Sequence, residues 1–182
     1  MSEFNELQLI KRRFFAMRNG VIADTLRKGG SPFKIIFGLN IPQIKDIARD
    51  LGPRPDLADA LWSNTSTRES LLLAPMIMCA DSVTQAQAEA MIIQSPSTEI
   101  VDNLCHSLLR NAPDAYKWAE VWTQSDTPIL RYAAMRVLWH YLTLHGDKIR
   151  SLAMAEIERN APLTRNIARM IVEEIDFLNS EN

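Results

Sequence analysis

One periodicity dominates this sequence: apolar residues recur in adjacent pairs every four positions. Between Thr98 and Asn111 they fall at Ile100, Val101, Leu104, Cys105, Leu108 and Leu109. This spacing places them on one stripe of a helix, and it places the polar Asp102, Asn103, His106, Ser107 and Arg110 opposite. The segment from about Thr127 to Thr143 repeats the pattern. No stretch alternates apolar and polar residues as a half-buried strand does, so the sequence predicts an all-α fold.

Cap and turn residues divide the chain into further helices. Asn40-Ile41-Pro42 predicts a cap and a first-turn proline that open a helix to about Leu51, which Gly52-Pro53 ends. Pro75 is expected to kink the helix that contains it. Most connections are short, so consecutive helices are expected to be antiparallel neighbours. The remaining helices are expected at about 4–18, 20–28, 55–62, 66–80, 84–93, 114–123, 148–158 and 163–178.

An internal echo suggests how these helices are organised. Leu61-Trp62-Ser63-Asn64 and Val121-Trp122-Thr123-Gln124 each precede an apolar helix, and their tryptophans lie 60 residues apart. With helical patterning throughout, this echo favours a short curved α-solenoid of HEAT-like antiparallel helix pairs over a closed bundle. No shift in composition marks a boundary, so residues 1–182 are predicted to form a single HEAT-like repeat domain.

The composition excludes several classes of protein. A hydrophobic fraction of 47% and a net charge of −2 are typical of a globular protein without a strong bulk preference for nucleic acid or membrane. The first residues lack a signal-peptide pattern, and no apolar run reaches the length of a membrane span. Two cysteines, Cys79 and Cys105, lie in helical patterns and indicate a reduced compartment. These features predict a cytoplasmic protein with no membrane partner.

Charge is unevenly distributed along the chain. Residues 1–54 contain ten Lys and Arg against five Asp and Glu, whereas residues 55–126 contain three against ten. The basic first third is interpreted either as a local phosphate-facing patch or as solvated helix faces.

Spacings typical of catalytic or metal sites are missing from the sequence. Gly29-Gly30 lacks the context of a phosphate loop, and the cysteines and histidines lack the spacing of a zinc site, so no metal or cofactor is predicted. Three polar patterns remain, and each is also explained by solvated or salt-bridged helix faces. The first is Asp102 with His106 and Arg110, and the second is Arg131 with Tyr132, Arg136, Trp139 and His140. The third is Arg165 with Arg169 and Glu173.

Several segments together resemble one known family. Phe33–Ala48, with Gly38-Leu39-Asn40-Ile41-Pro42 at its centre, resembles the signature of the HEAT-like DNA alkylation-repair glycosylases. Leu61-Trp62-Ser63, with Arg68-Glu69 after it, resembles the family's next repeat. Thr98-Glu99-Ile100-Val101-Asp102 is similar to its Asp-containing motif, and Ile129-Leu130-Arg131-Tyr132-Ala133 to its Arg-containing helix start. The resemblance covers roughly residues 15–175.

The resemblance implies a function and a site. Members hold duplex DNA on the concave face of a curved solenoid and release cationic alkylated purines without a metal. It implies that Asp102 is the carboxylate beside the target sugar and that Arg131 contacts a phosphate. Fixed negative charge would stabilise the oxocarbenium-like sugar left when a cationic base departs. Arg136, Arg165 and Arg169 are predicted to add contacts to the DNA backbone.

The chain also departs from the family pattern. Thr98 stands where the family has a tryptophan four residues before its aspartate, and the second family tryptophan aligns near Met170. Two hypotheses follow. In the first, the protein excises cationic alkylpurines from duplex DNA. In the alternative, it is a catalytically degenerate HEAT-like scaffold that binds DNA or a protein partner.

Overall fold

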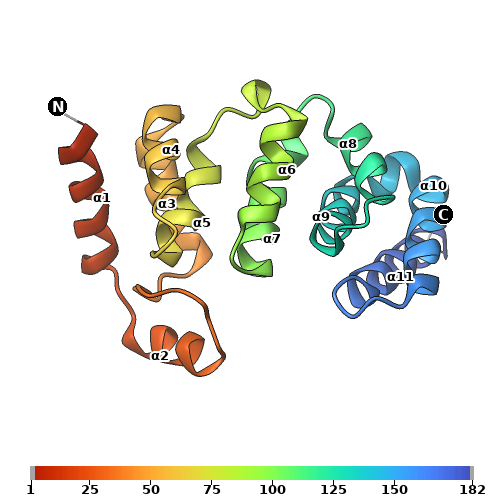
Figure 1. Ribbon diagram of the computed structural model, residues 1–182, viewed down its shortest axis with the longest axis horizontal. Helices are drawn as coiled ribbons and strands as arrows, with labels where there is room; N and C mark the ends of the chain where they lie inside the picture. The colour runs from red at the N-terminus through yellow and green to blue at the C-terminus, as the bar shows by residue number, and fades with distance from the viewer. Residues whose placement is uncertain (1–2, 181–182) are drawn as a thin grey trace. The chain divides into compact units, whose positions relative to one another are not determined.

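The computed structural model describes the backbone of residues 3–180 and the side chains of residues 6–180. This part of the chain is helical, which confirms the all-α prediction (Figure 1). Its contacts group into two compact units, one formed by residues up to Cys79 together with Pro96–Leu108, the other by Ala80–Ser95 and residues from Leu109 on. We call these the first and the second unit and describe each by itself. The predicted single domain and its solenoid arrangement stay predictions.

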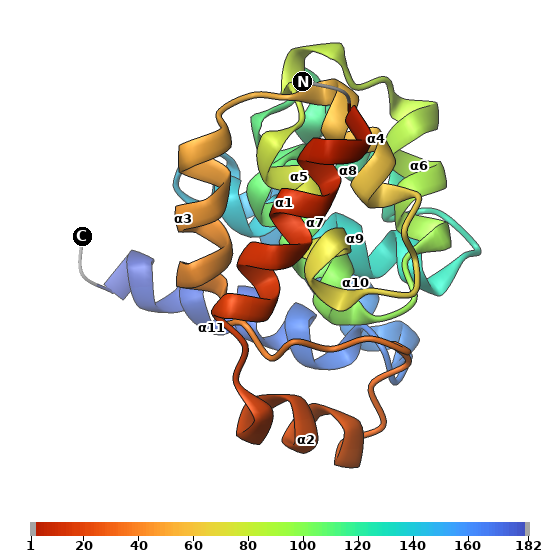
Figure 2. The ribbon, with the colours of Figure 1, turned by 90° about the vertical axis from the view of Figure 1, so that its left-hand side faces the viewer.

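The first unit contains six α-helices among the described residues. Its core is formed by fully buried side chains from five of them and from the α2–α3 loop, including Phe14, Leu39, Ile44, Leu57, Leu72 and Ile100. In Figure 2, α1 lies alongside α3 and α4, and α2 lies beyond its C-terminal end. The helices are α1 (Glu3–Ala16), α2 (Gly20–Lys28), α3 (Ile41–Leu51), α4 (Pro55–Trp62), α5 (Arg68–Ile77) and α7 (Thr98–Ser107).

The start of α3 has the cap that the sequence predicts. The side chain of Asn40 accepts a hydrogen bond from the Gln43 amide at 2.9 Å, and the Gln43 side chain accepts one from the Asn40 amide at 3.0 Å. Pro42 lies in the first turn, where a missing N–H costs no helical hydrogen bond. This reciprocal capping box satisfies two amides at a helix start, so the signature Asn40-Ile41-Pro42 forms its helix largely from local interactions.

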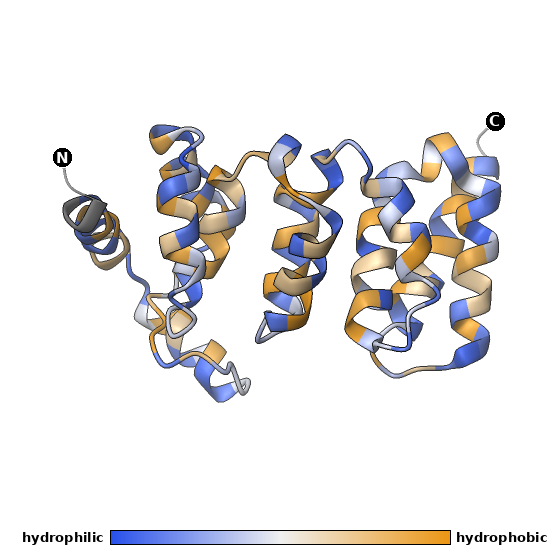
Figure 3. Cartoon of the chain, turned by 45° about the horizontal axis from the view of Figure 1, so that its top comes forward, coloured by the Kyte–Doolittle hydropathy of each residue, from blue (hydrophilic) through white to orange (hydrophobic). Residues whose placement is uncertain are grey.

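The second unit packs its helices around Trp122, Ile149, Ala153 and Ile171. The indole Nε1 of Trp122 donates to Glu89 Oε1 at 2.8 Å, which joins α8 to α6. The apolar residues lie on limited stripes of each helix, which Figure 3 shows as orange bands beside blue ones. The helices are α6 (Gln85–Gln94), α8 (Ala115–Trp122), α9 (Pro128–Leu138), α10 (Leu142–Arg159) and α11 (Arg165–Ser180).

Helix ends differ from the periodic pattern at three places. The helix predicted to reach Asn111 ends at Ser107, and the one predicted to reach Thr143 ends at Leu138. In both cases the chain tightens into a short 3-10 helix, Leu109–Asn111 or Trp139–Tyr141. Leu109 is buried in the first, whereas the second has no fully buried residue. The helix expected at 148–158 instead begins at Leu142 and continues through a non-helical backbone at His145. No helix in the described part of the chain is both long and apolar enough to span a bilayer.

Candidate functional site

Asp102 lies in the middle of α7, and its side chain is half-buried. The next residue, Asn103, is buried and donates from Nδ2 to the Leu72 carbonyl of α5 at 2.8 Å. The hydroxyl of Ser107 in turn donates to Asn103 Oδ1 at 3.2 Å. The sequence pattern placed Asn103 on the solvent face, and this is wrong. Asn103 attaches α7 to α5 immediately beside the candidate carboxylate.

A second attachment holds the first turn of α7. Arg68, at the start of α5, donates from Nε to Glu99 Oε2 at 2.9 Å and from Nη2 to Glu99 Oε1 at 2.5 Å. This bidentate pair fixes both position and orientation of the two side chains. Burial opposes the charge on Arg68, but the Glu99 and Glu69 carboxylates outweigh it and raise the pKa of the guanidinium. Asp102 therefore lies on a helix that is held to α5 on both sides of it along the chain.

Glu69 connects this arrangement to the signature loop before α3. Its side chain is fully buried, and its carboxylate accepts hydrogen bonds from the amides of Phe37 at 3.1 Å and Gly38 at 2.9 Å. It also accepts from Arg68 Nη1 at 3.1 Å. Gly38 has a φ of +82°, and a Cβ added there would lie 2.2 Å from the Asn19 carbonyl oxygen. Only glycine fits this position, which explains why the signature contains one.

A groove of about 440 Å³ opens at the first turn of α7. Ser97, Thr98 and Glu99 form one side, and the end of α2 with the Gly29–Pro32 turn forms the other. Thr98 lies one helical turn before Asp102 on the same side of α7, because residues four apart share a helix face. The groove lining therefore includes Thr98, on the helix face of Asp102, but not Asp102 itself.

The four predicted arginines lie in the second unit. Arg131 is in α9 and only 8% exposed. Its Nε donates to Glu156 Oε1 at 3.1 Å and its Nη1 to the Ser125 carbonyl at 2.7 Å. The Thr164 hydroxyl also donates to Glu156 Oε1, at 2.5 Å. The guanidinium thus joins α9 to α10, a role that the sequence pattern did not indicate because Glu156 lies 25 residues further along the chain.

The remaining predicted arginines are more accessible. Arg136 is half-buried in α9, and Arg169 is exposed on α11. Arg165, at the first residue of α11, donates from Nη1 to Asn160 Oδ1 at 3.4 Å. Glu173 is exposed one turn after Arg169. Asp102 and these arginines belong to different units, and each is placed only within its own.

A ring cluster in the second unit includes titratable groups. The Tyr116 ring lies 4.2 Å from the His145 ring and 5.4 Å from the Tyr141 ring, measured between centroids. Burial, with the neighbouring Glu120 carboxylate, raises the pKa of Tyr116 to about 12. Glu120 forms an ion pair with Lys148, and this pair, with the neighbouring Tyr116, outweighs burial and lowers the pKa of Glu120.

Comparison with known proteins supports the class that these features define. A family model described as DNA alkylation repair enzyme matches residues 10–175. The match covers most of the chain, so the protein belongs to the DNA alkylation repair enzyme family. This confirms the resemblance seen in the signature around Gly38 and Pro42. No curated protein and no solved structure shows significant similarity to the chain.

Proposed function

We propose that this protein engages duplex DNA containing alkylated purines and releases the cationic base, with Asp102 as the reacting carboxylate. The observation that carries the proposal is the family match over residues 10–175, which includes the whole of α7. Asp102 on that helix is supported by the attachments of Glu99 and Asn103 to α5. Such support matters because a catalytic group must be held close to its productive geometry.

The chemistry requires a fixed negative charge and a water molecule. When the bond between C1′ and an alkylated purine nitrogen breaks, its electron pair goes to the purine and neutralises the cationic base. The sugar that remains has oxocarbenium character, which a carboxylate at the site of Asp102 stabilises. Water then adds its oxygen to C1′ and gives up a proton to the carboxylate or to solvent.

Arginines of the second unit supply the contacts to phosphates in this proposal. Exposed Arg169 and half-buried Arg136 and Arg165 have side chains long enough to meet a DNA backbone. Arg131 enters with a double role, since Glu156 and the Ser125 carbonyl occupy part of its guanidinium. The remaining N–H groups of the Arg131 guanidinium are the ones that would donate to a phosphate.

The deciding experiment measures release of N7-alkylguanine from a DNA duplex with protein in large excess over DNA. Wild-type protein is expected to release the base. Asp102→Asn should abolish release while leaving the melting temperature within a degree or two, because the amide keeps the side-chain shape. Asp59→Asn, at an exposed position of α4, is the matched control and should keep full activity. Absence of release by the wild-type protein contradicts the enzymatic proposal.

A second candidate function is DNA binding without excision. It is favoured by the buried pair of Arg131 with Glu156 and by the exposed, non-aromatic Thr98 and Met170, which the family pattern fills with tryptophan. Affinity for duplex DNA at about 50 mM and about 200 mM salt separates the candidates, because backbone binding weakens steeply with salt. Salt-sensitive binding without base release supports this second function. No binding even at low salt contradicts both and leaves a protein partner.

A further inference from the structure

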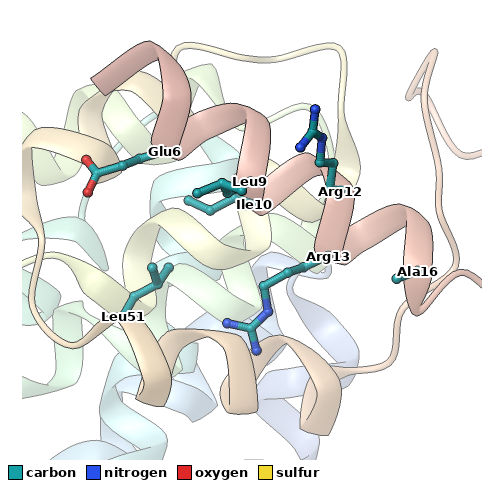
Figure 4. Close-up of a pocket in the computed structure, with 7 residues that line it drawn as sticks. All are labelled: Glu6, Leu9, Ile10, Arg12, Arg13, Ala16 and Leu51. Atoms are coloured by element: carbon teal, nitrogen blue, oxygen red, sulfur yellow. The ribbon is translucent and has the colours of Figure 1, made fainter. Parts of the chain in front are cut away.

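The first unit has an apolar groove along α1, and Asp102 is not among the residues that line it (Figure 4). It has a volume of about 510 Å³ and lies between α1 and the C-terminal end of α3. Leu9, Ile10 and Ala16 of α1 and Leu51 of α3 provide its apolar lining. No catalytic or DNA-binding role assigned above involves these residues.

The apolar surface of this groove is incompletely covered. Ile10 is buried in the core, but its neighbour Leu9 is 45% exposed. Contiguous exposed apolar surface framed by polar residues is typical of a site that another molecule covers.

Two arginines and one glutamate are among the residues that line the groove. Arg13 pairs with Asp50 at 2.6 Å across the groove, and Glu6 pairs with Arg54 at 2.8 Å. Arg54 also pairs with Asp56 at 2.7 Å, so each of these carboxylates has an arginine partner within the unit. Arg12 forms an ion pair with none of the carboxylates that the structure describes. In Figure 4 its guanidinium points away from that of Arg13, on the other side of α1.

We propose that this groove binds a short acidic amphipathic helix of a partner protein. Such a helix would insert two or three large apolar side chains over Leu9 and Leu51 and place a carboxylate beside Arg12. From Glu6 to Ala16 the groove follows α1 for about 15 Å, which accommodates about three helical turns. Apolar anchors at helical spacing with charges beside them are the usual form of helix-in-groove recognition.

Charge and polarity favour this occupant over two others. DNA presents phosphates, which gain nothing from an apolar lining of leucine, isoleucine and alanine. A second copy of this chain in a two-fold dimer would bring Arg12 and Arg13 to both sides of the interface, because such an interface uses one patch twice. An acidic amphipathic helix would instead cover Leu9 and Leu51 with its apolar side chains and place a carboxylate beside Arg12.

The test uses the full chain and a synthetic helical peptide of about 14 residues, long enough to span the groove. The peptide carries leucines at helical positions i, i+4 and i+7 with glutamates beside them and a fluorophore for anisotropy. A second peptide replaces each glutamate by lysine. The acidic peptide is expected to bind saturably and the lysine peptide weakly, with Leu9→Ser and Arg12→Glu each weakening the acidic peptide about tenfold.

Two matched controls assign the effect to the groove. Leu144→Ser changes a leucine that is 70% exposed in the second unit, and Arg49→Glu changes an exposed arginine of α3; both should leave peptide affinity unchanged. Circular dichroism melting confirms that Leu9→Ser and Arg12→Glu remain folded. DNA affinity and base release should be the same in both groove variants, so failure here is separate from failure of the proposed function.

Four outcomes overturn the proposal. The first is the absence of saturable binding by the acidic peptide. The second is equal binding of the lysine peptide, and the third is an equal loss with Leu144→Ser. The fourth is a wild-type dimer, seen by light scattering, that Leu9→Ser dissociates, since this would assign the groove to a second copy of the chain.

Discussion

Arg68 and Arg131 are two buried arginines, one in each unit, and they show the same bonding pattern. Each lies in a helix that follows a tryptophan-containing segment, and each donates to a carboxylate from a later helix, Glu99 or Glu156. Each also donates to a backbone carbonyl, of Leu39 for one and Ser125 for the other. The pattern shows that a buried arginine in this chain holds neighbouring helices together, whatever else it does.

The two arginines differ in what completes their surroundings. Beside Arg68 there is a second carboxylate, Glu69, which accepts hydrogen bonds from loop amides before α3. Beside Arg131 the additional group is the Thr164 hydroxyl, which donates to Glu156. The first arrangement therefore has a fully buried carboxylate that supports backbone geometry, whereas in the second Glu156 pairs with Arg131 and also with Arg159 at 3.6 Å. Substitution of Glu69 is expected to cost more stability than substitution of Arg131.

The largest effect is expected for Glu69→Gln. The amide keeps the shape but removes the charge, and one end now presents N–H groups to the Phe37 or Gly38 amide. Removing one partner of a buried ion pair costs about 3–5 kcal/mol, and we expect a loss of this size in the free energy of unfolding. Urea denaturation measures it. Asp46→Asn, in an exposed pair with Arg49, is the control and should change stability by less than about 1 kcal/mol.

Arg131→Met should cost less, about 3 kcal/mol, since Arg159 and Thr164 remain near Glu156 to compensate its charge. The double variant Arg131→Met/Glu156→Leu removes both charges and should recover most of that loss. Its DNA affinity then tests the phosphate role without the complication of unfolding. If the folded double variant binds DNA with the affinity of the wild type, Arg131 has only a structural role.

Local patterns in the sequence account for the helices but not for their long-range partners. The Asn40 cap and the helical type of the Asp102 and Arg131 segments follow from residues within one or two turns, so periodicity and capping predict them. Asn103 reaches Leu72 and Arg131 reaches Glu156 across 31 and 25 residues. No local pattern identifies such partners, so the candidate site could be located on its helices but its supports could not.

Glu99→Gln tests whether the Arg68 arrangement positions Asp102. Glu99 has a side chain that is 37% exposed, so the loss of stability should be about 1–2 kcal/mol, below that of the buried substitutions. Base release should nevertheless fall, because the first turn of α7 loses its bidentate attachment to Arg68. Lys45→Gln, on α3, serves as a control for charge removal and should leave release unchanged. Full activity of Glu99→Gln at a temperature where it is folded would show that this attachment does not position the carboxylate.

The smallest expected effect is a loss of stability at alkaline pH that comes from Tyr116 in the second unit. The pKa of Tyr116 is raised from 10.0 to about 12 in the folded protein, so the folded state holds the phenolic proton more tightly than the unfolded state. This contribution to stability is complete below pH 10 and is lost as the pH rises through about 12. The melting temperature of the wild type should therefore fall relative to that of Tyr116→Phe over that range.

Tyr141→Phe is the comparison, because burial also raises the pKa of Tyr141. If the wild type loses as much or more melting temperature relative to Tyr141→Phe as relative to Tyr116→Phe, the Tyr116 environment is not the main source of the pH dependence.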